Sequence, residues 1–179
     1  MKTEIICAGF GGQGVLTAGL IIAQNCINED KNVTWIPSYG AEMRGGTANC
    51  NIKISDKEIS SPFVTDIDIL IALNEPSLDK FEKNIKPGGL LFVNSSLIAD
   101  RDYRQDVKVV LVPMTELANE ANNPRGANLA MLGAFVEKSS LFDKDLFSKG
   151  IDDFFTAKGK VNKGNAICFK LGWDYAHKN

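Results

Sequence analysis

The stretch "IICAGFGGQGVLTAGL", residues 5–20, places Gly9, Gly11 and Gly14 on the spacing G-x-G-x-x-G. An apolar, β-branched run typical of a buried strand precedes the glycines, and a helical pattern of apolar residues follows them. A turn of this kind brings backbone N–H groups and the positive end of a helix dipole together, which suits a phosphate group. The same spacing also occurs in tight turns that bind no ligand, since glycine fits such turns regardless of function.

A dinucleotide site makes a second demand, because the next strand should end in an acidic residue that binds the ribose hydroxyls. Here the expected strand 32–38 ends in "WIPS" without a carboxylate, and Glu29 and Asp30 precede it. No arginine stands beside Ser38 to hold the additional phosphate of NADP. NAD(P) binding is therefore disfavoured.

A second loop with chemical potential, "PSYGAEMRGGTANC", directly follows this strand. It brings Ser38, Tyr39, Glu42 and Arg44 close to two adjacent glycines. Arginine forms paired hydrogen bonds with a carboxylate or phosphate, and glycine lets backbone approach a ligand or a partner. The alternative is a structural loop in which Glu42 and Arg44 form solvated ion pairs.

The remaining reactive side chains argue against a self-contained enzyme. His177, the single histidine, stands two residues from the end of the sequence, where a solvated side chain is expected. The cysteines form no C-x-x-C pair and match no zinc or iron–sulfur spacing, so buried, reduced thiols are expected. They are Cys7, Cys26, Cys50 and Cys168.

The composition indicates an ordinary globular protein. The 179 residues suffice for one domain with its own core, and 44% are hydrophobic. A net charge of −2, without a run of lysine and arginine, gives no reason to expect nucleic acid as a partner. The start, "MKTEIICAGF", predicts neither a signal peptide nor a membrane span, so we expect a cytoplasmic protein that does not enter the membrane.

Strand and helix patterns alternate along the chain, which predicts an α/β fold. We expect one three-layer domain over residues 1–179, with a twisted, mostly parallel or mixed sheet and a peripheral, helical C-terminal segment at about 141–179. Strands are expected at 4–10, 32–38, 47–55, 66–74, 90–96 and 107–113, the third of them half-exposed. Helices are expected at 14–29, 76–85 and 122–139, and a turn at 86–89.

Single residues refine this outline. Asn122 or Asn123 is expected to cap the helix 122–139, with Pro124 in its first turn. Gly133 inside that helix indicates close packing. Asn74, at the end of a buried strand, is interpreted as a helix cap rather than a ligand contact.

The two glycine stretches, with "SP" before a strand, "ALNEPSLDKF", "KPGG" and "NLAMLGA" in this order, resemble the gamma subunit of 2-oxoacid:ferredoxin oxidoreductases. The resemblance covers about residues 5–136. It implies a role in oxidative decarboxylation of a 2-oxoacid to an acyl-coenzyme A, with electrons passed to ferredoxin. The loop resembles the 2-oxoglutarate and branched-chain types more than the pyruvate type.

The resemblance also implies how cofactors and partners are distributed. Thiamine diphosphate and magnesium belong to alpha and beta subunits, and iron–sulfur clusters to the beta or a ferredoxin-like subunit. The gamma-type chain binds none of these alone and contributes subunit interface and a coenzyme A path. The isolated chain is expected to be inactive and to form a homodimer through the surface that its partners normally cover.

Eleven residues match the two family motifs and are the predicted cofactor-binding residues, with no catalytic residue and no metal ligand predicted. The turn is expected to contact the pyrophosphate of coenzyme A, and Arg44 to hold an anion or a neighbouring subunit. Two alternatives stay open: a free-standing nucleotide-binding enzyme, and a purely structural scaffold subunit. The residues are Gly11, Gly12, Gln13, Gly14, Ser38, Tyr39, Gly40, Glu42, Arg44, Gly45 and Gly46.

Overall fold

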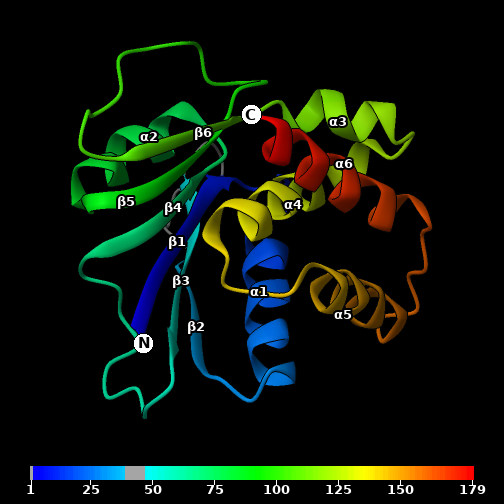
Figure 1. Ribbon diagram of the computed structural model, residues 1–179, viewed down its shortest axis with the longest axis horizontal. Coiled ribbons are helices and arrows are strands. Elements are labelled where there is room, and N and C mark those ends of the chain that lie inside the picture. The colour runs from blue at the N-terminus through cyan, green and yellow to red at the C-terminus, as the bar shows by residue number, and fades with distance from the viewer. Residues whose placement is uncertain (1, 39–46) are drawn as a thin grey trace. The chain divides into compact units, whose positions relative to one another are not determined.

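The computed structural model describes residues 2–38 and 47–179, and Figure 1 labels their helices and strands. The strands are β1 (Lys2–Phe10), β2 (Asn32–Ser38), β3 (Thr47–Ser55), β4 (Ile67–Ala72), β5 (Ile85–Asn94) and β6 (Lys108–Val112). The helices are α1 (Val15–Asn28), α2 (Glu75–Phe81), α3 (Met114–Glu120), α4 (Ala127–Ser139), α5 (Lys144–Thr156) and α6 (Gly164–Lys178). Short 3-10 helices occupy Glu82–Asn84 and Pro124–Gly126.

The strands of the described residues form one mixed sheet in the order β2-β3-β1-β4-β5-β6. β1 runs parallel to β4 and antiparallel to β3, so the two pairing types meet at this strand. β3 thereby separates β1 from β2, although a helix directly connects β1 and β2 in the sequence. The predicted α/β class with a mixed sheet is confirmed.

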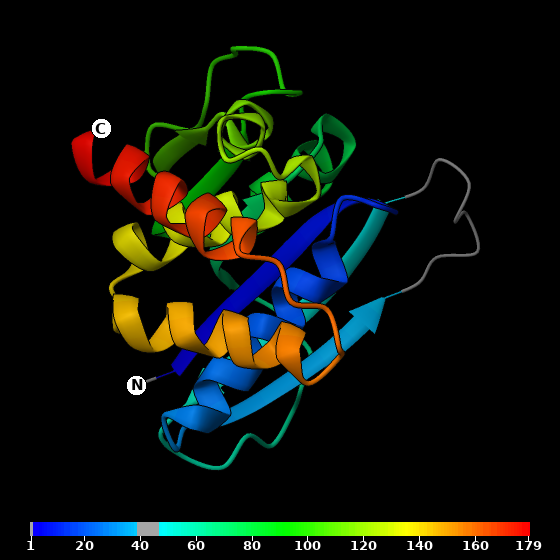
Figure 2. The same ribbon diagram turned by 90° about the vertical axis from the view of Figure 1, so that its right-hand side faces the viewer.

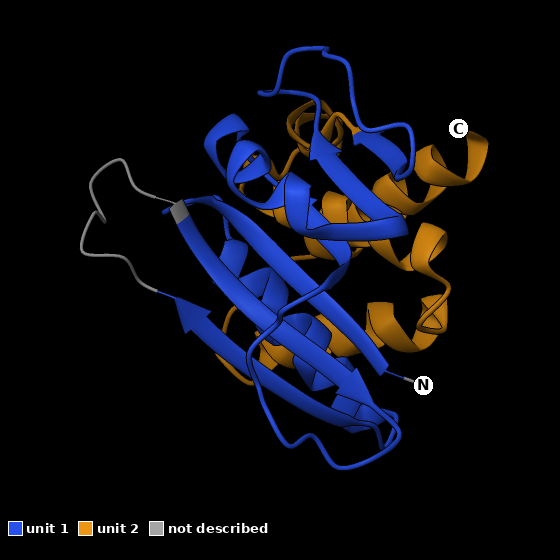
Figure 3. Ribbon diagram, turned by 90° about the vertical axis from the view of Figure 1, so that its left-hand side faces the viewer, with its two compact units in different colours: residues 1–111 blue, residues 112–179 orange. Residues whose placement is uncertain are grey.

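The chain divides into two compact units, residues 1–111 and 112–179, coloured separately in Figure 3. The first contains β1 to β5, most of β6 and helices α1 and α2, and the second contains α3 to α6. The prediction of one domain over residues 1–179 stays a prediction.

Helices cover both faces of the sheet in the first unit. On one face, Gly19 of α1 lies against the Cys50 thiol, and Cys50 pairs with Cys7 of β1. On the other, Leu78 of α2 shares a buried cluster with Ile6. Because successive residues of a strand point to opposite faces, α1 and α2 lie on opposite sides of β1. Figure 2 shows α1 running alongside the strands, and the predicted three layers are present in this unit.

The prediction of a half-exposed strand at 47–55 is wrong. Cys50, Ile52 and Ile54 are buried as expected, but Asn49 and Lys53 on the polar side of the strand are buried too, each only 5% exposed, and Asn51 is half-buried. The connection 56–66 supplies part of the cover, because the Val64 N–H donates to Asn51 Oδ1 at 3.1 Å. The alternation of polar and apolar residues therefore separates the two faces of the sheet here, but the polar face is not exposed to solvent.

Glu4 joins this polar face to the connection. Its Oε1 lies 2.5 Å from Lys2 Nζ and 3.4 Å from Lys53 Nζ, while Oε2 accepts the Thr65 N–H at 3.0 Å. Burial raises the pKa of Glu4, but the hydrogen bonds from Lys2 and Thr65 and the charges of both lysines outweigh it and lower the pKa to about 2. The carboxylate is thus a charged tie between β1, β3 and residues 56–66.

In the second unit, α4 and α6 cross in close contact through glycines. A Cβ built at Gly133 would lie 2.0 Å from the Phe169 carbonyl oxygen, and one at Gly172 would lie 1.8 Å from the Ala130 carbonyl oxygen. The close packing predicted at Gly133 is therefore confirmed. Phe147 of α5 completes the core, stacked on Phe169 with ring centroids 5.7 Å apart.

Three local predictions need correction. Residues 86–89 do not form a separate turn, because they lie within β5 as a bulge: Ile67 pairs with Ile85, and Ile69 pairs with Leu90. The helix expected at 122–139 begins only at Ala127, because Pro124–Gly126 form a separate 3-10 helix before it. Helix α3 was absent from the predicted elements.

The close crossing of α4 and α6 predicts that a single methyl group added at the contact strongly lowers the stability of the protein. Gly172→Ala should destabilise the protein by roughly 3 kcal/mol, because the new Cβ meets backbone that cannot move aside within the helix. Gly11→Ala is the matched control, since a Cβ there lies more than 4 Å from every atom that the structure describes outside its chain neighbours. Chemical denaturation measures both variants, and equal effects would contradict the packing.

Glu4 predicts a pH dependence of stability. Its folded-state pKa lies below the ordinary value of 4.5, so its contribution is complete above that pH and is lost as the pH falls toward about 2. The loss is at most ~3 kcal/mol. Glu4→Gln should be less stable at pH 7 and should show a smaller loss of stability on acidification. The control Glu58→Gln, at an exposed site in the connection, should keep the wild-type profile.

Candidate functional site

The predicted glycine turn lies between β1 and α1, as the sequence indicates. Gly12 has φ +92° and Gly14 has φ +76°, the left-handed region that glycine enters without a steric penalty. Gly14 is the N-cap residue of α1, and its carbonyl accepts the Ala18 N–H at 2.8 Å. The backbone thus reverses from strand to helix within residues 11–14.

The side chain of Gln13 fixes this reversal. Its Oε1 accepts the Phe10 N–H at 2.6 Å, and its Nε2 donates to the Leu73 carbonyl at 3.1 Å. The amide therefore connects the end of β1 with the residue that follows β4. Gln13 is half-buried and has a structural task, so the N–H groups of the turn are the better candidates for ligand binding.

Two asparagines organise the neighbouring strand ends. Asn94 Nδ2 donates to the same Leu73 carbonyl at 3.0 Å, while the Leu73 N–H donates to the Ala8 carbonyl at 2.8 Å. Asn74, only 2% exposed, caps α2 by accepting the Ser77 N–H at 2.9 Å. Its predicted role as a helix cap is confirmed, and the ends of β1, β4 and β5 form one edge.

The glycines of the motif serve different purposes. A Cβ at Gly9 would lie 2.6 Å from Gln13 Oε1 and 2.8 Å from Leu73 Cβ, so packing excludes a side chain there. The positive φ at position 14 requires glycine there. Gly11 has neither constraint, because a Cβ would meet no atom of the described residues within 4 Å and its φ is not in the left-handed region. Gly11 is exposed and leaves an open approach to the turn.

The predicted residues of the second loop are only partly described. Ser38 is the exposed last residue of β2, opposite Asn49 of β3. The other predicted site residues of this loop lie outside the described residues, so their placement is not part of the site geometry. They are Tyr39, Gly40, Glu42, Arg44, Gly45 and Gly46.

The sheet order weighs further against a dinucleotide site. In a nucleotide-binding Rossmann half, the second strand lies beside the first, so that its terminal acidic residue reaches the ribose. Here antiparallel β3 separates β2 from β1, and Ser38 ends β2.

The Cys7 and Cys50 thiols are neighbours on the paired strands β1 and β3. No group of three or more histidine, cysteine, aspartate and glutamate side chains suited to a metal ion occurs among the described residues. All four cysteines are buried and free, as predicted. His177 is exposed, with Nδ1 2.8 Å from Glu137 Oε1. None of the helices in the described part is both long and apolar enough to cross a bilayer.

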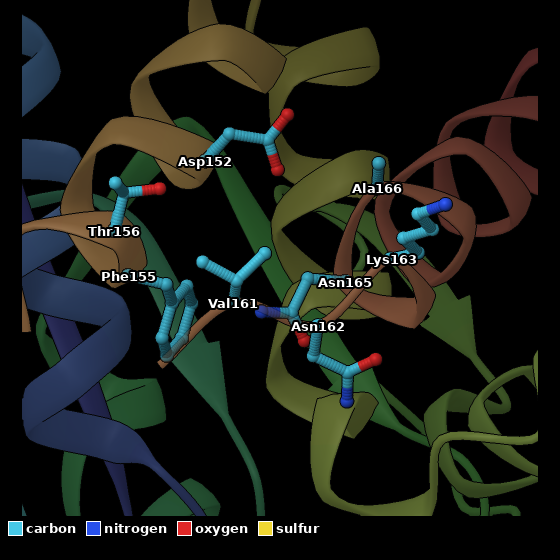
Figure 4. Close-up of a pocket in the computed structure, with 8 residues that line it drawn as sticks. All are labelled: Asp152, Phe155, Thr156, Val161, Asn162, Lys163, Asn165 and Ala166. Carbon is cyan, nitrogen blue, oxygen red and sulfur yellow. The ribbon is translucent and has the colours of Figure 1, made fainter. Parts of the chain in front are cut away.

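The second unit contains a pocket of about 350 Å³ between the end of α5 and the start of α6, shown in Figure 4. Phe155 and Val161 form part of its wall, and Asn165 is its most buried polar side chain. Sequence reasoning missed this pocket. Asparagines between helices are typical caps and turns, so no local signal indicated it.

A mixed α/β sheet, with an open glycine turn at a helix N-terminus, defines an α/β protein with a candidate anion-binding turn. Residues 4–175 match the family model for pyruvate ferredoxin/flavodoxin oxidoreductase. The chain belongs to this family.

The chain is similar to known proteins over nearly its whole length. The ketoisovalerate oxidoreductase subunit VorA of Methanothermobacter marburgensis is 38% identical over 99% of this chain, which spans 37% of that protein. The 2-oxoglutarate synthase subunit KorC of Methanocaldococcus jannaschii is 35% identical over 98% of this chain and 95% of its own length.

Two solved structures have the same fold. The keto/oxoacid ferredoxin oxidoreductase gamma subunit of Geobacter sulfurreducens matches with a TM-score of 0.81 and 27% identity, over 99% of both chains. The 2-oxoglutarate:ferredoxin oxidoreductase of Magnetococcus marinus, solved with 2-oxoglutarate, coenzyme A and succinyl-CoA bound, matches with a TM-score of 0.86 and 26% identity. That match covers 99% of this chain and 31% of the larger one.

The structural role of the Gln13 hydrogen bonds can be tested by measuring the free energy of unfolding. Gln13→Leu should destabilise the protein by about 1–2 kcal/mol, because the Phe10 N–H and the Leu73 carbonyl each lose a partner. Gln24→Leu is the control, since the exposed Gln24 amide donates to the exposed Asn28 side chain at 3.2 Å, and this variant should change stability by less than about 0.5 kcal/mol. Urea unfolding measures the stability of both variants, and equal losses of stability would argue against a structural role for the Gln13 hydrogen bonds.

Proposed function

We propose that this chain is the gamma-type subunit of a 2-oxoacid:ferredoxin oxidoreductase. The assembly would release the carboxylate of a 2-oxoacid as CO₂, form a thioester between the acyl group and the sulfur of coenzyme A, and release the thiol proton. Two electrons would pass to two oxidised ferredoxins, each of which accepts one. The similarity to KorC over nearly the full length of both chains carries this proposal.

Within that assembly we assign this chain a binding and interface role. The glycine turn would hold the pyrophosphate of coenzyme A through backbone N–H groups at the start of α1. The open space at Gly11 supports this assignment, since neither packing nor backbone conformation requires glycine there. The motif residues outside the described ranges, Arg44 among them, belong to the same proposal.

The reaction's other cofactors would belong to partner subunits. Thiamine diphosphate with magnesium would lie on alpha and beta subunits, and iron–sulfur clusters on the beta or a ferredoxin-like subunit. The cysteines support that distribution, because Cys7 and Cys50 are neighbours on paired strands whereas Cys26 and Cys168 lie on helices α1 and α6, and an iron–sulfur cluster needs about four ligands at one site. A cytoplasmic location and a homodimer of the isolated chain complete the proposal.

The assembly is tested by purifying the tagged chain from its native host without oxygen. Subunits that bind thiamine diphosphate and iron–sulfur clusters should copurify, and the preparation should reduce a dye only with both a 2-oxoacid and coenzyme A. A chain that copurifies with no such subunits and shows no activity would overturn the proposal.

The coenzyme A contact has a separate test in that complex. Gly11→Val should raise the KM for coenzyme A at least about tenfold, since the side chain would obstruct the turn. The thermal midpoint should stay unchanged, because a Cβ at Gly11 meets no atom of the described residues within 4 Å. Ala99→Val, at another exposed loop position in the first unit, is the control. An unchanged KM in Gly11→Val would exclude the turn as the contact and leave the assembly proposal standing.

A further inference from the structure

The helices that follow the adjacent parallel strands β1 and β4 lie on opposite faces of the sheet. α1 follows β1 on the face of Cys50, and α2 follows β4 on the other face, where Leu78 shares a buried cluster with Ala8 and Ala72. In open α/β sheets, the carboxyl ends of two strands that diverge in this way are the common position of a ligand. The ends of β1 and β4 are therefore the expected ligand position in the first unit.

The amide of Gln13 keeps these two strand ends apart. The strands pair as far as Ala8 and Ala72, and the Leu73 N–H donates to the Ala8 carbonyl at 2.8 Å. In a regular parallel ladder the Phe10 N–H would then donate to the Leu73 carbonyl. The Gln13 amide stands between these two groups and bonds both, at 2.6 and 3.1 Å. The ends of β1 and β4 are thus separated by the width of one amide.

Asn74 lies at these strand ends and carries an enclosed donor. It follows β4 in extended conformation, with φ −149° and ψ 162°, so its side chain lies on the same face as that of Ala72. Its Oδ1 accepts the Ser77 N–H at 2.9 Å, and because a backbone N–H only donates, the orientation of the amide is fixed. Nδ2 has no hydrogen-bond partner in the described part of the chain, and neither has the enclosed Ser77 hydroxyl.

The other two side-chain amides at these strand ends are satisfied through both of their polar atoms. Gln13 bonds at its oxygen and its nitrogen, as described above. Asn94 Nδ2 donates to the Leu73 carbonyl at 3.0 Å, and its Oδ1 accepts the Ser96 N–H at 3.2 Å. An enclosed donor without a partner is unfavourable, so the Asn74 nitrogen, at an expected ligand position, calls for an acceptor oxygen on a ligand.

Phe10 is placed to cover this donor. The register of β1 and β4 puts Phe10 level with Asn74, and the alternation along both strands puts the two side chains on the same face. Phe10 is 37% exposed and leads directly into the open glycine turn. A ring at the surface can rotate aside without opening the core, so a ligand at the turn can reach the enclosed nitrogen.

We propose that Asn74 is a second contact for the pyrophosphate that the glycine turn holds. Nδ2 donates to a pyrophosphate oxygen after the Phe10 ring moves aside, while Oδ1 keeps its bond to Ser77. The neighbouring Glu75 carboxylate lies 3.8 Å from the Arg101 guanidinium, which offsets its charge. The inference rests on the proposed function, because the pyrophosphate is that of coenzyme A, and it adds a contact from a second strand.

Replacement of the donor is tested in the purified complex. Asn74→Ser keeps a capping oxygen for α2 and removes the donor. The KM for coenzyme A should rise at least about tenfold with kcat unchanged. The KM for pantetheine, which has the thiol arm without a pyrophosphate, should not change. Asp143→Ser makes the same kind of replacement at the cap of α5 and is the control.

Two results of this experiment would overturn the contact. One is an unchanged KM for coenzyme A in Asn74→Ser, and the other is an equal rise for coenzyme A and pantetheine. A raised KM in Gly11→Val with an unchanged KM in Asn74→Ser would refute the Asn74 contact alone. A tagged chain without partner subunits would instead refute the proposed assembly.

The isolated full chain gives a second readout that needs no variant of Asn74. Inorganic pyrophosphate, added to the ¹⁵N-labelled chain, should shift the Asn74 side-chain amide signals together with the Gly11 and Gly12 backbone signals. Shifts in the turn without a shift at Asn74 would overturn the inference. Absence of any shift would overturn pyrophosphate binding at these strand ends altogether.

The covering role of Phe10 is measured by hydrogen exchange in the same labelled chain. Phe10→Ala should speed the exchange of the Asn74 side-chain amide protons with solvent at least about tenfold, because the ring no longer encloses them. Leu97→Ala, at another exposed apolar residue of the first unit, is the control and should leave the rate unchanged. Equal rates in the two variants would overturn Phe10 as the cover.

Discussion

The side-chain amide of Gln13 holds the candidate site together. It bonds the last residue of β1 through Oε1 and the Leu73 carbonyl after β4 through Nε2. Asn94 donates to the same carbonyl from the end of β5, so two side-chain amides share the acceptor that follows β4. Gly9 follows from this arrangement, because a Cβ there would collide with the Gln13 amide. The polar atoms that close the sheet edge thus determine which glycines are structural.

Because of that arrangement, some residues of the motif maintain the structure and others leave the backbone accessible to a ligand. A side-chain amide with partners at both ends is poorly available to an anion, whereas backbone N–H groups at the start of a helix have no intrahelical partner. Gly12 and Gly14 provide the left-handed backbone. At Gly11, neither the backbone conformation nor packing against the described residues requires glycine. An exposed glycine without conformational need is expected where a ligand or partner must approach the backbone closely.

Patterns of apolar residues predicted most of the strands and the main helices, because burial on one or both faces leaves a periodic trace. The bulge at residues 86–89 was missed, since "KPGG" has the composition of a turn whether or not the strand continues around it. Burial of Lys53 was also hidden, because its partner Glu4 is 49 positions away and only the fold brings them together. The hydrogen bond from Asn123 Nδ2 to Asn165 Oδ1 escaped prediction for the same reason, as the two residues are 42 positions apart. Long-range polar pairing leaves no local pattern.

The lengths of the relatives place a further constraint on the proposed subunit role. The fold occurs nearly alone in KorC, yet it fills 37% of VorA, where the remaining chain is covalently attached. Attachment supplies an effective concentration in the millimolar range, so a fused domain needs little intrinsic affinity for its neighbours. A separate subunit has no such help and must bind through its own surface, usually through a few well-packed apolar side chains. Phe63, at 61% exposure, is an exposed apolar side chain of the kind that such an interface uses.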